Sequence, residues 1–321
     1  MISESFIIKP AYRLSSPLWY LAGIMTVALG YMLGQMPLVW VQMQKVKAYK
    51  IGVADVQKFL ETNDFSILHI DANWGLFLML CMFLGAWLAY IVLLRIQKIP
   101  LLSTITGRNS FDFFRYFFGF SVWMGLTFVI ELIFYINKPE VYRWQFDVSA
   151  FLPLLLIGIT LVPMQAAMEE VFFRGYFLQG SFAASGKIVF SLALSTLFFS
   201  MVHSMNPEIE KYGFWTMQIY YIGAGLFLAL LALADNGLEL SMGIHAATNV
   251  FGSVFLKYEG SVLQTKTLVE QKLENPWPMI LSFYLCAAAM WWLCSNKYLF
   301  NLFDALKQKQ KKDEPFSTGM N

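Results

Sequence analysis

Four ionisable residues stand inside apolar stretches of this 321-residue sequence: Glu169, Glu170, His203 and His245. An acid or base kept at membrane depth is costly, and such a residue marks a functional site by default. Carboxylates and imidazoles in one place can activate water, carry protons or bind a metal ion. The four residues therefore predict an active site, and their neighbours indicate how the work divides among them.

The two glutamates stand in the segment MQAAMEEVFFRGYFLQG, which also holds an arginine. Glu170 and Arg174 are four residues apart, so they share one face of a helix and can pair. Glu169 is turned about 100° away from Glu170, on the side of Gln165 and Phe173. We expect Arg174 to neutralise Glu170, and Glu169 to stay free to face a cavity. A paired charge that only fixes helix packing is the interpretation that we favour for Glu170 and Arg174, and it is the alternative for Glu169.

The two histidines stand in separate apolar segments. FFSMVHS places Phe199 one helical turn before His203, and SMGIHAATNVFGS places Asn249 four residues after His245. Either histidine alone can be a polar packing residue. The chain has only 3 histidines, however, and these two follow the free carboxylate in the sequence. We therefore expect Glu169, His203 and His245 to converge, with Asn249 beside His245.

The composition is that of an integral membrane protein. Hydrophobic residues make up 58% of the chain and charged residues 14%, whereas soluble domains carry about 25% charged residues. The mean hydropathy is +0.55. The net charge of +2 gives no support to nucleic-acid binding. Cys81, Cys286 and Cys294 lie in apolar runs without CxxC spacing, and we interpret them as small apolar fillers.

Continuous apolar runs predict an all-α, polytopic bundle of about eight membrane helices. The runs lie near 17–40, 74–94, 116–136, 150–168, 187–203, 213–234, 238–256 and 277–296. Only helices and closed barrels satisfy their backbone groups in lipid, and runs without alternation favour helices. The run at 238–256 is the least apolar and needs shielding by its neighbours. We predict a multi-pass protein of a plasma or inner membrane, with both chain ends on one side.

Three spaced patterns together resemble one known family. EExxxR at 169–174, FxxxH at 199–203 and HxxxN at 245–249 occur in this order on successive apolar segments. In this they are similar to the type II CAAX prenyl endopeptidase family, also called CPBP or Abi, which includes bacteriocin-processing and self-immunity members. The string EEVFFRGYF adds to the likeness. The resemblance covers about 150–256, so we divide the chain into N-terminal membrane helices (1–149, with a polar loop near 41–73), a protease core (150–256), and a last helix with a charged tail (257–321).

The resemblance implies an intramembrane endopeptidase and assigns roles to the matching residues. Glu169 and His203 would hold and deprotonate the attacking water. His245 and Asn249 would donate hydrogen bonds to the oxyanion of the tetrahedral intermediate. Glu170 and Arg174 would be structural support. The partners would be the lipid bilayer and a membrane-embedded protein or peptide substrate, either a lipidated CAAX protein or a bacteriocin-type peptide.

A metal ion is a separate question, because the family is often described as metalloproteases. Glu169, His203 and His245 could supply three ligands to Zn²⁺ and leave one position for water. The H-E-x-x-H signature of zinc proteases is absent from the sequence. Asn249 also suits an oxyanion better than a zinc ion. We favour a metal-free, glutamate-activated water and keep the zinc site as the alternative.

Two other classes of function remain open from the sequence. Buried Glu and His residues also suit a transporter with a proton relay, although no inverted repeat is visible. A catalytically idle immunity or scaffold protein is the second, although nothing in the three motifs is degenerate. Neither a GxSG nor a GxGD motif of other intramembrane proteases occurs. Glu131, inside the third apolar run, is left either to line the cavity or to pair with Arg115.

Overall fold

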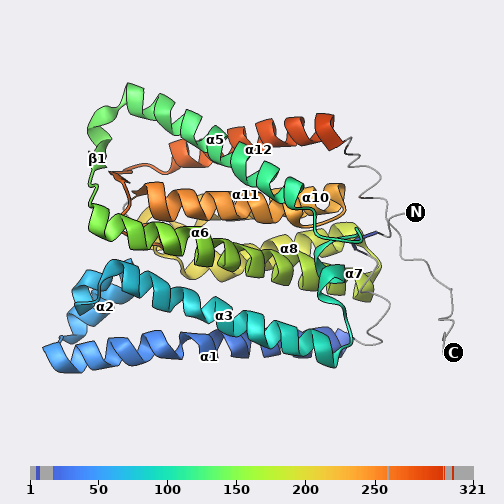
Figure 1. Cartoon of the computed structure of the whole chain (residues 1–321), viewed down its shortest axis with the longest axis horizontal. Coiled ribbons are helices and arrows are strands. Elements are labelled where there is room, and N and C mark those ends of the chain that lie inside the picture. Colours follow the sequence, from blue (N-terminus) through green and yellow to red (C-terminus); the bar gives the residue numbers. More distant parts are fainter. Residues whose placement is uncertain (1–4, 8–16, 259, 299, 301–305, 307–321) are drawn as a thin grey trace.

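The computed structural model describes residues 5–7, 17–258, 260–298, 300 and 306, and it is dominated by long helices that run roughly along one axis (Figure 1). The long helices are α1 (Pro17–Tyr49), α3 (Ala72–Ile96), α5 (Phe113–Asn137), α6 (Val148–Glu170), α8 (Ile188–Val202), α10 (Phe214–Asp235), α11 (Glu239–Val250) and α12 (Trp277–Tyr298). Shorter helices are α2 (Val53–Thr62), α4 (Leu101–Ile105), α7 (Gln179–Ser185) and α9 (Pro207–Tyr212). The helical turns η1 (Phe65–Leu68), η2 (Pro139–Val141), η3 (Val171–Leu178), η4 (His203–Met205) and η5 (Phe251–Phe255) complete the helical elements.

Seven helices of the described chain are long and apolar enough to cross a membrane. The prediction of an all-α, multi-pass integral membrane protein is thereby confirmed. α1 begins and α12 ends at the same end of the bundle (Figure 1). The eighth predicted run also forms a helix, α11, but this has only 12 residues before η5 follows. Its residues 239–247 are all buried, so α11 is an inner helix that its neighbours shield from lipid.

α11 lies against α5 at unusually short range because both helices carry glycine at the crossing. A Cβ atom at Gly243 would lie 2.1 Å from the carbonyl oxygen of Tyr116. A Cβ atom at Gly119 would lie 2.7 Å from the carbonyl oxygen of Leu240. These are backbone atoms that cannot give way, so only glycine allows the approach. The contact fixes the height of α11 in the bundle two residues before His245.

Two π-helical turns follow the predicted catalytic residues directly. α6 continues into the π-helix η3 immediately after Glu170, and α11 continues into the π-helix η5 two residues after Asn249. A π-turn widens the helix and changes which side chains share a face, and such turns are frequent at functional sites. The long helix of 150–185 is therefore not a uniform rod at the point where the chemistry is expected.

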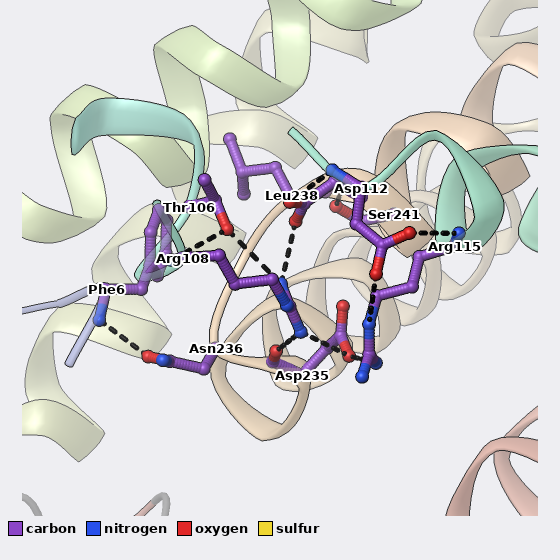
Figure 2. Close-up of polar contacts among 10 residues, drawn as sticks. Phe6, Thr106, Arg108, Asp112, Arg115, Asp235, Asn236, Leu238 and Ser241 are labelled. Atoms are coloured by element: carbon purple, nitrogen blue, oxygen red, sulfur yellow. Dashed lines mark hydrogen bonds and ion pairs between the residues drawn. The ribbon is translucent and has the colours of Figure 1, made fainter. Parts of the chain in front are cut away.

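The turn between α10 and α11 is fastened by ion pairs to the segment that leads into α5 (Figure 2). Arg108 pairs with Asp235 at 3.1 Å and with Glu239 at 3.1 Å. Arg115 pairs with Asp235 and, at 3.2 Å, with Asp112. The side chains of Asp235 and Glu239 are fully buried. Two buried carboxylates are tolerable here because two guanidinium groups reach them from another segment.

A small sheet lies at the end of the bundle away from the turn between α10 and α11 (Figure 1). It was not expected from the sequence. Its strands β1 (Tyr142–Trp144), β2 (Leu256–Tyr258) and β3 (Val269–Gln271) are ordered β1-β3-β2. β3 pairs antiparallel with β1 and parallel with β2. Glu131 accepts a hydrogen bond from the Tyr142 hydroxyl at 2.9 Å. Its partner is therefore this sheet, and Arg115 is engaged elsewhere.

Removal of Arg108 tests the ion cluster. Arg108→Ala leaves Asp235 and Glu239 buried with too few counter-charges, and we expect a loss on the order of 3–5 kcal/mol in the free energy of unfolding. The measurement is denaturation in detergent micelles. Arg143→Ala is the control, because Arg143 is 67% exposed in its pair with Glu270 and such surface pairs contribute about 0–1 kcal/mol. Equal losses in the two variants would contradict the assignment.

Candidate active site

Glu170 is the buried anchor of the site. Its Oε1 accepts a hydrogen bond from Arg174 Nη1 at 2.9 Å and lies 2.8 Å from His245 Nδ1. Arg174 is also fully buried, and its Nη2 donates to the carbonyl oxygen of Gly225 at 3.0 Å. Its guanidinium carbon lies 4.4 Å from the centre of the Phe199 ring. The predicted pair of Glu170 and Arg174 therefore forms, and it also holds α10 and α11.

Glu169 points away from Arg174, as the helix spacing predicts. Its Oε1 accepts a hydrogen bond from Gln165 Nε2 at 2.6 Å. Its Oε2 lies 3.5 Å from His245 Nε2 and 3.8 Å from His203 Nε2. This oxygen is buried and has no hydrogen-bond partner among the described residues. The expected convergence of Glu169, His203 and His245 is present, at separations longer than direct hydrogen bonds.

His203 follows the last residue of α8 and is oriented by that helix. Its Nδ1 lies 2.7 Å from the carbonyl oxygen of Phe199. Because a carbonyl oxygen only accepts, Nδ1 carries the proton, and in the neutral imidazole Nε2 is then an acceptor. Nε2 is the atom that faces Glu169. The ring centre of His203 lies 4.3 Å from that of Phe199, which gives the FxxxH spacing a physical meaning.

Asn249 reaches the site through Gln165, a residue that lies in none of the three motifs. Asn249 Nδ2 donates to Gln165 Oε1 at 3.0 Å, and Gln165 Nε2 in turn donates to Glu169. Gln165 precedes Glu169 by four residues, so its place on the same helix face was the available signal. The amide bridges α6 and α11 and fixes which carboxylate oxygen of Glu169 faces the histidines.

The predicted zinc ligands do not form a ready metal site. No group of three or more His, Cys, Asp or Glu side chains is arranged to hold a metal ion within the part of the chain that the structure describes. Glu170 and the Phe199 carbonyl occupy the Nδ1 atoms of His245 and His203. Only the two Nε2 atoms and Glu169 Oε2 face one another. The zinc site therefore stays a hypothesis, and no chemical step below depends on it.

Comparison with known proteins agrees with this geometry. Residues 150–251 match the family described as type II CAAX prenyl endopeptidase Rce1-like. The predicted resemblance is confirmed for this segment. The Rce1-like segment runs from the start of α6 into η5 and includes Glu169, His203, His245 and Asn249. It lies within the predicted core of 150–256.

One relative aligns with more than half of the chain. The chain is 32% identical over 179 residues to the uncharacterized protein YyaK of Bacillus subtilis (strain 168). The aligned part covers 56% of this chain and 58% of that protein. No solved structure matches the chain. The comparisons thus support the family of the 150–251 segment and name no substrate.

Loss of charge at the two adjacent glutamates should lower the stability of the protein by very different amounts. Glu170→Gln leaves Arg174 buried without a counter-charge, and we expect it to lower the free energy of unfolding by on the order of 3–5 kcal/mol. Glu169→Gln removes a carboxylate oxygen that bonds to nothing in the described chain, so we expect a change of about 1 kcal/mol or less. Thermal unfolding of both variants in the same detergent measures the difference. Equal destabilisation would refute the division of roles.

Proposed function

We propose that this protein is an intramembrane endopeptidase that hydrolyses a peptide bond of a membrane-associated substrate. One observation carries the proposal: the buried, unpartnered Oε2 of Glu169 faces the Nε2 atoms of His203 and His245 at 3.8 and 3.5 Å. A carboxylate and two imidazoles so placed supply the donor and acceptor atoms that can hold and deprotonate a water. The Rce1-like match of residues 150–251 supports the reaction class.

Glu169 acts as the general base together with His203. A water between them donates one hydrogen to Glu169 Oε2 and the other to His203 Nε2, which is an acceptor because Nδ1 donates to the Phe199 carbonyl. Both lone pairs of the water oxygen then remain available for attack. As the oxygen bonds to the substrate carbonyl carbon, one proton passes to Glu169. A positioned base of this kind contributes about 10²–10⁴-fold in rate.

His245 and Asn249 stabilise the negative charge that develops on the substrate carbonyl oxygen. In its imidazolium form His245 donates Nδ1–H to Glu170 and presents Nε2–H to the site. The Asn249 amide has two N–H donors, of which one is engaged with Gln165.

Collapse of the intermediate completes the proton balance. The C–N bond breaks, and the proton held by Glu169 moves to the departing nitrogen, which leaves as an amine. Glu169 returns to the carboxylate form, and the new carboxyl group of the product carries the oxygen of the water. The reaction consumes one water and needs no redox partner.

The substrate class follows from where the site lies. The catalytic helices are surrounded by helices that are apolar and long enough to cross a membrane, so a substrate has to arrive with a membrane-associated segment. A lipidated CAAX-type protein and a bacteriocin-type peptide both meet this condition. A transporter or an idle scaffold has no use for an attacking water, and the variant below separates these functions from proteolysis.

Charge removal at Glu169 tests the function. Glu169→Gln retains the fold, and we expect hydrolysis to fall about 10²–10⁴-fold because the base is lost. Asn249→Ala should lower the rate about 100- to 1000-fold through the oxyanion. The readout is the set of membrane-associated peptides in cells that carry wild-type protein or each variant. Glu210→Gln, at an exposed position of α9, is the control. An unchanged peptide set in Glu169→Gln would show that proteolysis is not the function.

Metal removal tests the metal-free form of the mechanism. We expect activity to survive chelation and the purified protein to hold less than one zinc ion per chain. Elemental analysis together with activity before and after chelation measures both. Stoichiometric zinc whose removal abolishes activity would replace the glutamate-only mechanism with one in which Glu169, His203 and His245 are ligands.

A further inference from the structure

A second aromatic ring, from another helix, touches the His203 imidazole. The ring centre of Tyr221 lies 4.9 Å from that of His203, and the two planes are inclined by 30°. Tyr221 belongs to α10 and is buried. His203 therefore has two ring neighbours, Phe199 from α8 and Tyr221 from α10. The Glu169–His203 chemistry assigns no part to Tyr221.

The Tyr221 hydroxyl is held by the turn that follows His203. Asn206 Nδ2 donates to this hydroxyl at 2.9 Å. The Glu208 carboxyl lies close enough to this hydroxyl to interact with it electrostatically. Asn206 ends η4 and Glu208 lies in the first turn of α9, so both come within five residues of the histidine. The ring that contacts His203 is thus fixed by the same turn that carries the imidazole out of α8.

Glu208 is itself held from a third direction. Its Oε1 accepts from the backbone N–H of Val262 at 3.0 Å and from the Tyr258 hydroxyl at 3.3 Å. The side chain is buried, and burial raises the pKa of the Glu208 carboxyl to about 7. A buried carboxyl is costly unless its hydrogen bonds are made. Glu208 Oε1 makes two such bonds, with β2 and with the loop after β2, whereas its buried Oε2 has no hydrogen-bond partner among the described residues. The turn after His203 is thus anchored to β2 and to the loop that follows it.

The imidazole needs this support because the contacts from its own helix come from one residue, Phe199, through its carbonyl oxygen and its ring. The contact of Nδ1 with the Phe199 carbonyl leaves the ring free to tilt about that bond, which would swing Nε2 away from Glu169. A displacement of about 1 Å at a reacting group can cost on the order of 100-fold in rate. A ring packed against the face of the imidazole removes that freedom, provided that the ring cannot move.

We propose that Tyr221 is a positioning residue for His203, and that Asn206 holds Tyr221 in place through its hydroxyl. The catalytic consequence rests on the proposed function, but the positioning itself does not. A ring that served only as filler would not need a hydroxyl that is bound by the turn after His203. The hydroxyl and the ring therefore have separable effects.

The first experiment separates ring from hydroxyl by kinetics on the full-length protein in detergent, with a peptide substrate found by the peptide comparison above. We expect Tyr221→Leu to lower kcat on the order of 100-fold with little change in KM, and Tyr221→Phe to lower kcat by a smaller factor. Asn206→Ala, which removes the donor to the Tyr221 hydroxyl, should match Tyr221→Phe. Glu210→Gln, at an exposed position of α9, is the control. A folded Tyr221→Leu protein with wild-type kcat would overturn the proposal.

The second experiment does not need peptidase activity. The chain has 3 histidines, so NMR of protein with isotope-labelled histidine gives few ring signals, and His203→Gln identifies the one of interest. We expect that signal to shift in Tyr221→Leu and, by less, in Tyr221→Phe and Asn206→Ala, while the His69 signal stays in place. An unshifted His203 signal in Tyr221→Leu and Asn206→Ala refutes the positioning. If the wild-type protein cleaves no peptide, the proposed function fails, and this measurement still decides on Tyr221.

Discussion

The interaction on which the rest of the structure depends is the shared Glu170 carboxylate oxygen, which is bound by Arg174 and by His245 at once. All three groups are buried in a helical bundle that spans a membrane, where neither charge can be hydrated. Removal of one partner leaves the others uncompensated, so the three hold one another in place. Arg174 extends the arrangement to the Gly225 carbonyl. The helices α6, α10 and α11 thus meet around one charge pair.

This arrangement leaves the neighbouring carboxylate free. Glu170 is occupied, and the helix turn between adjacent residues sends Glu169 to the other side, where Gln165 binds one oxygen and leaves the other toward His203 and His245. Glu170 also decides which nitrogen of His245 faces Glu169, since it binds Nδ1. The same backbone therefore carries one glutamate that stabilises and one that is available for reaction. A single acidic residue here could not both pair with Arg174 and remain available for reaction.

Local spacing in the sequence was enough to predict part of this site. The pairing of Glu170 with Arg174 and the opposite direction of Glu169 follow from helix geometry, and apolar runs predicted the helices. The place of Gln165 beside Glu169 also follows from helix spacing, but its bond to Asn249 does not. That bond and the contacts of Tyr221 and Glu208 join segments that are distant in sequence, and no spacing rule reveals them. The three-residue strands were missed because they are too short for a periodic signal. α11 was predicted as a helix, but its polar residues and short length made it an inner helix and not a membrane span.

The ion pairs at the turn between α10 and α11 join the Rce1-like segment to the part of the chain that precedes it. Asp235 and Glu239 lie inside the Rce1-like segment, whereas Arg108 and Arg115, which neutralise them, lie before it. A fragment that began at residue 150 would carry two buried carboxylates without their cations, and its α11 would lack the glycine-lined surface of α5. The Rce1-like segment therefore depends on ion-pair partners that lie outside it. The helix that presents His245 is seated by residues that a family boundary drawn on sequence leaves out.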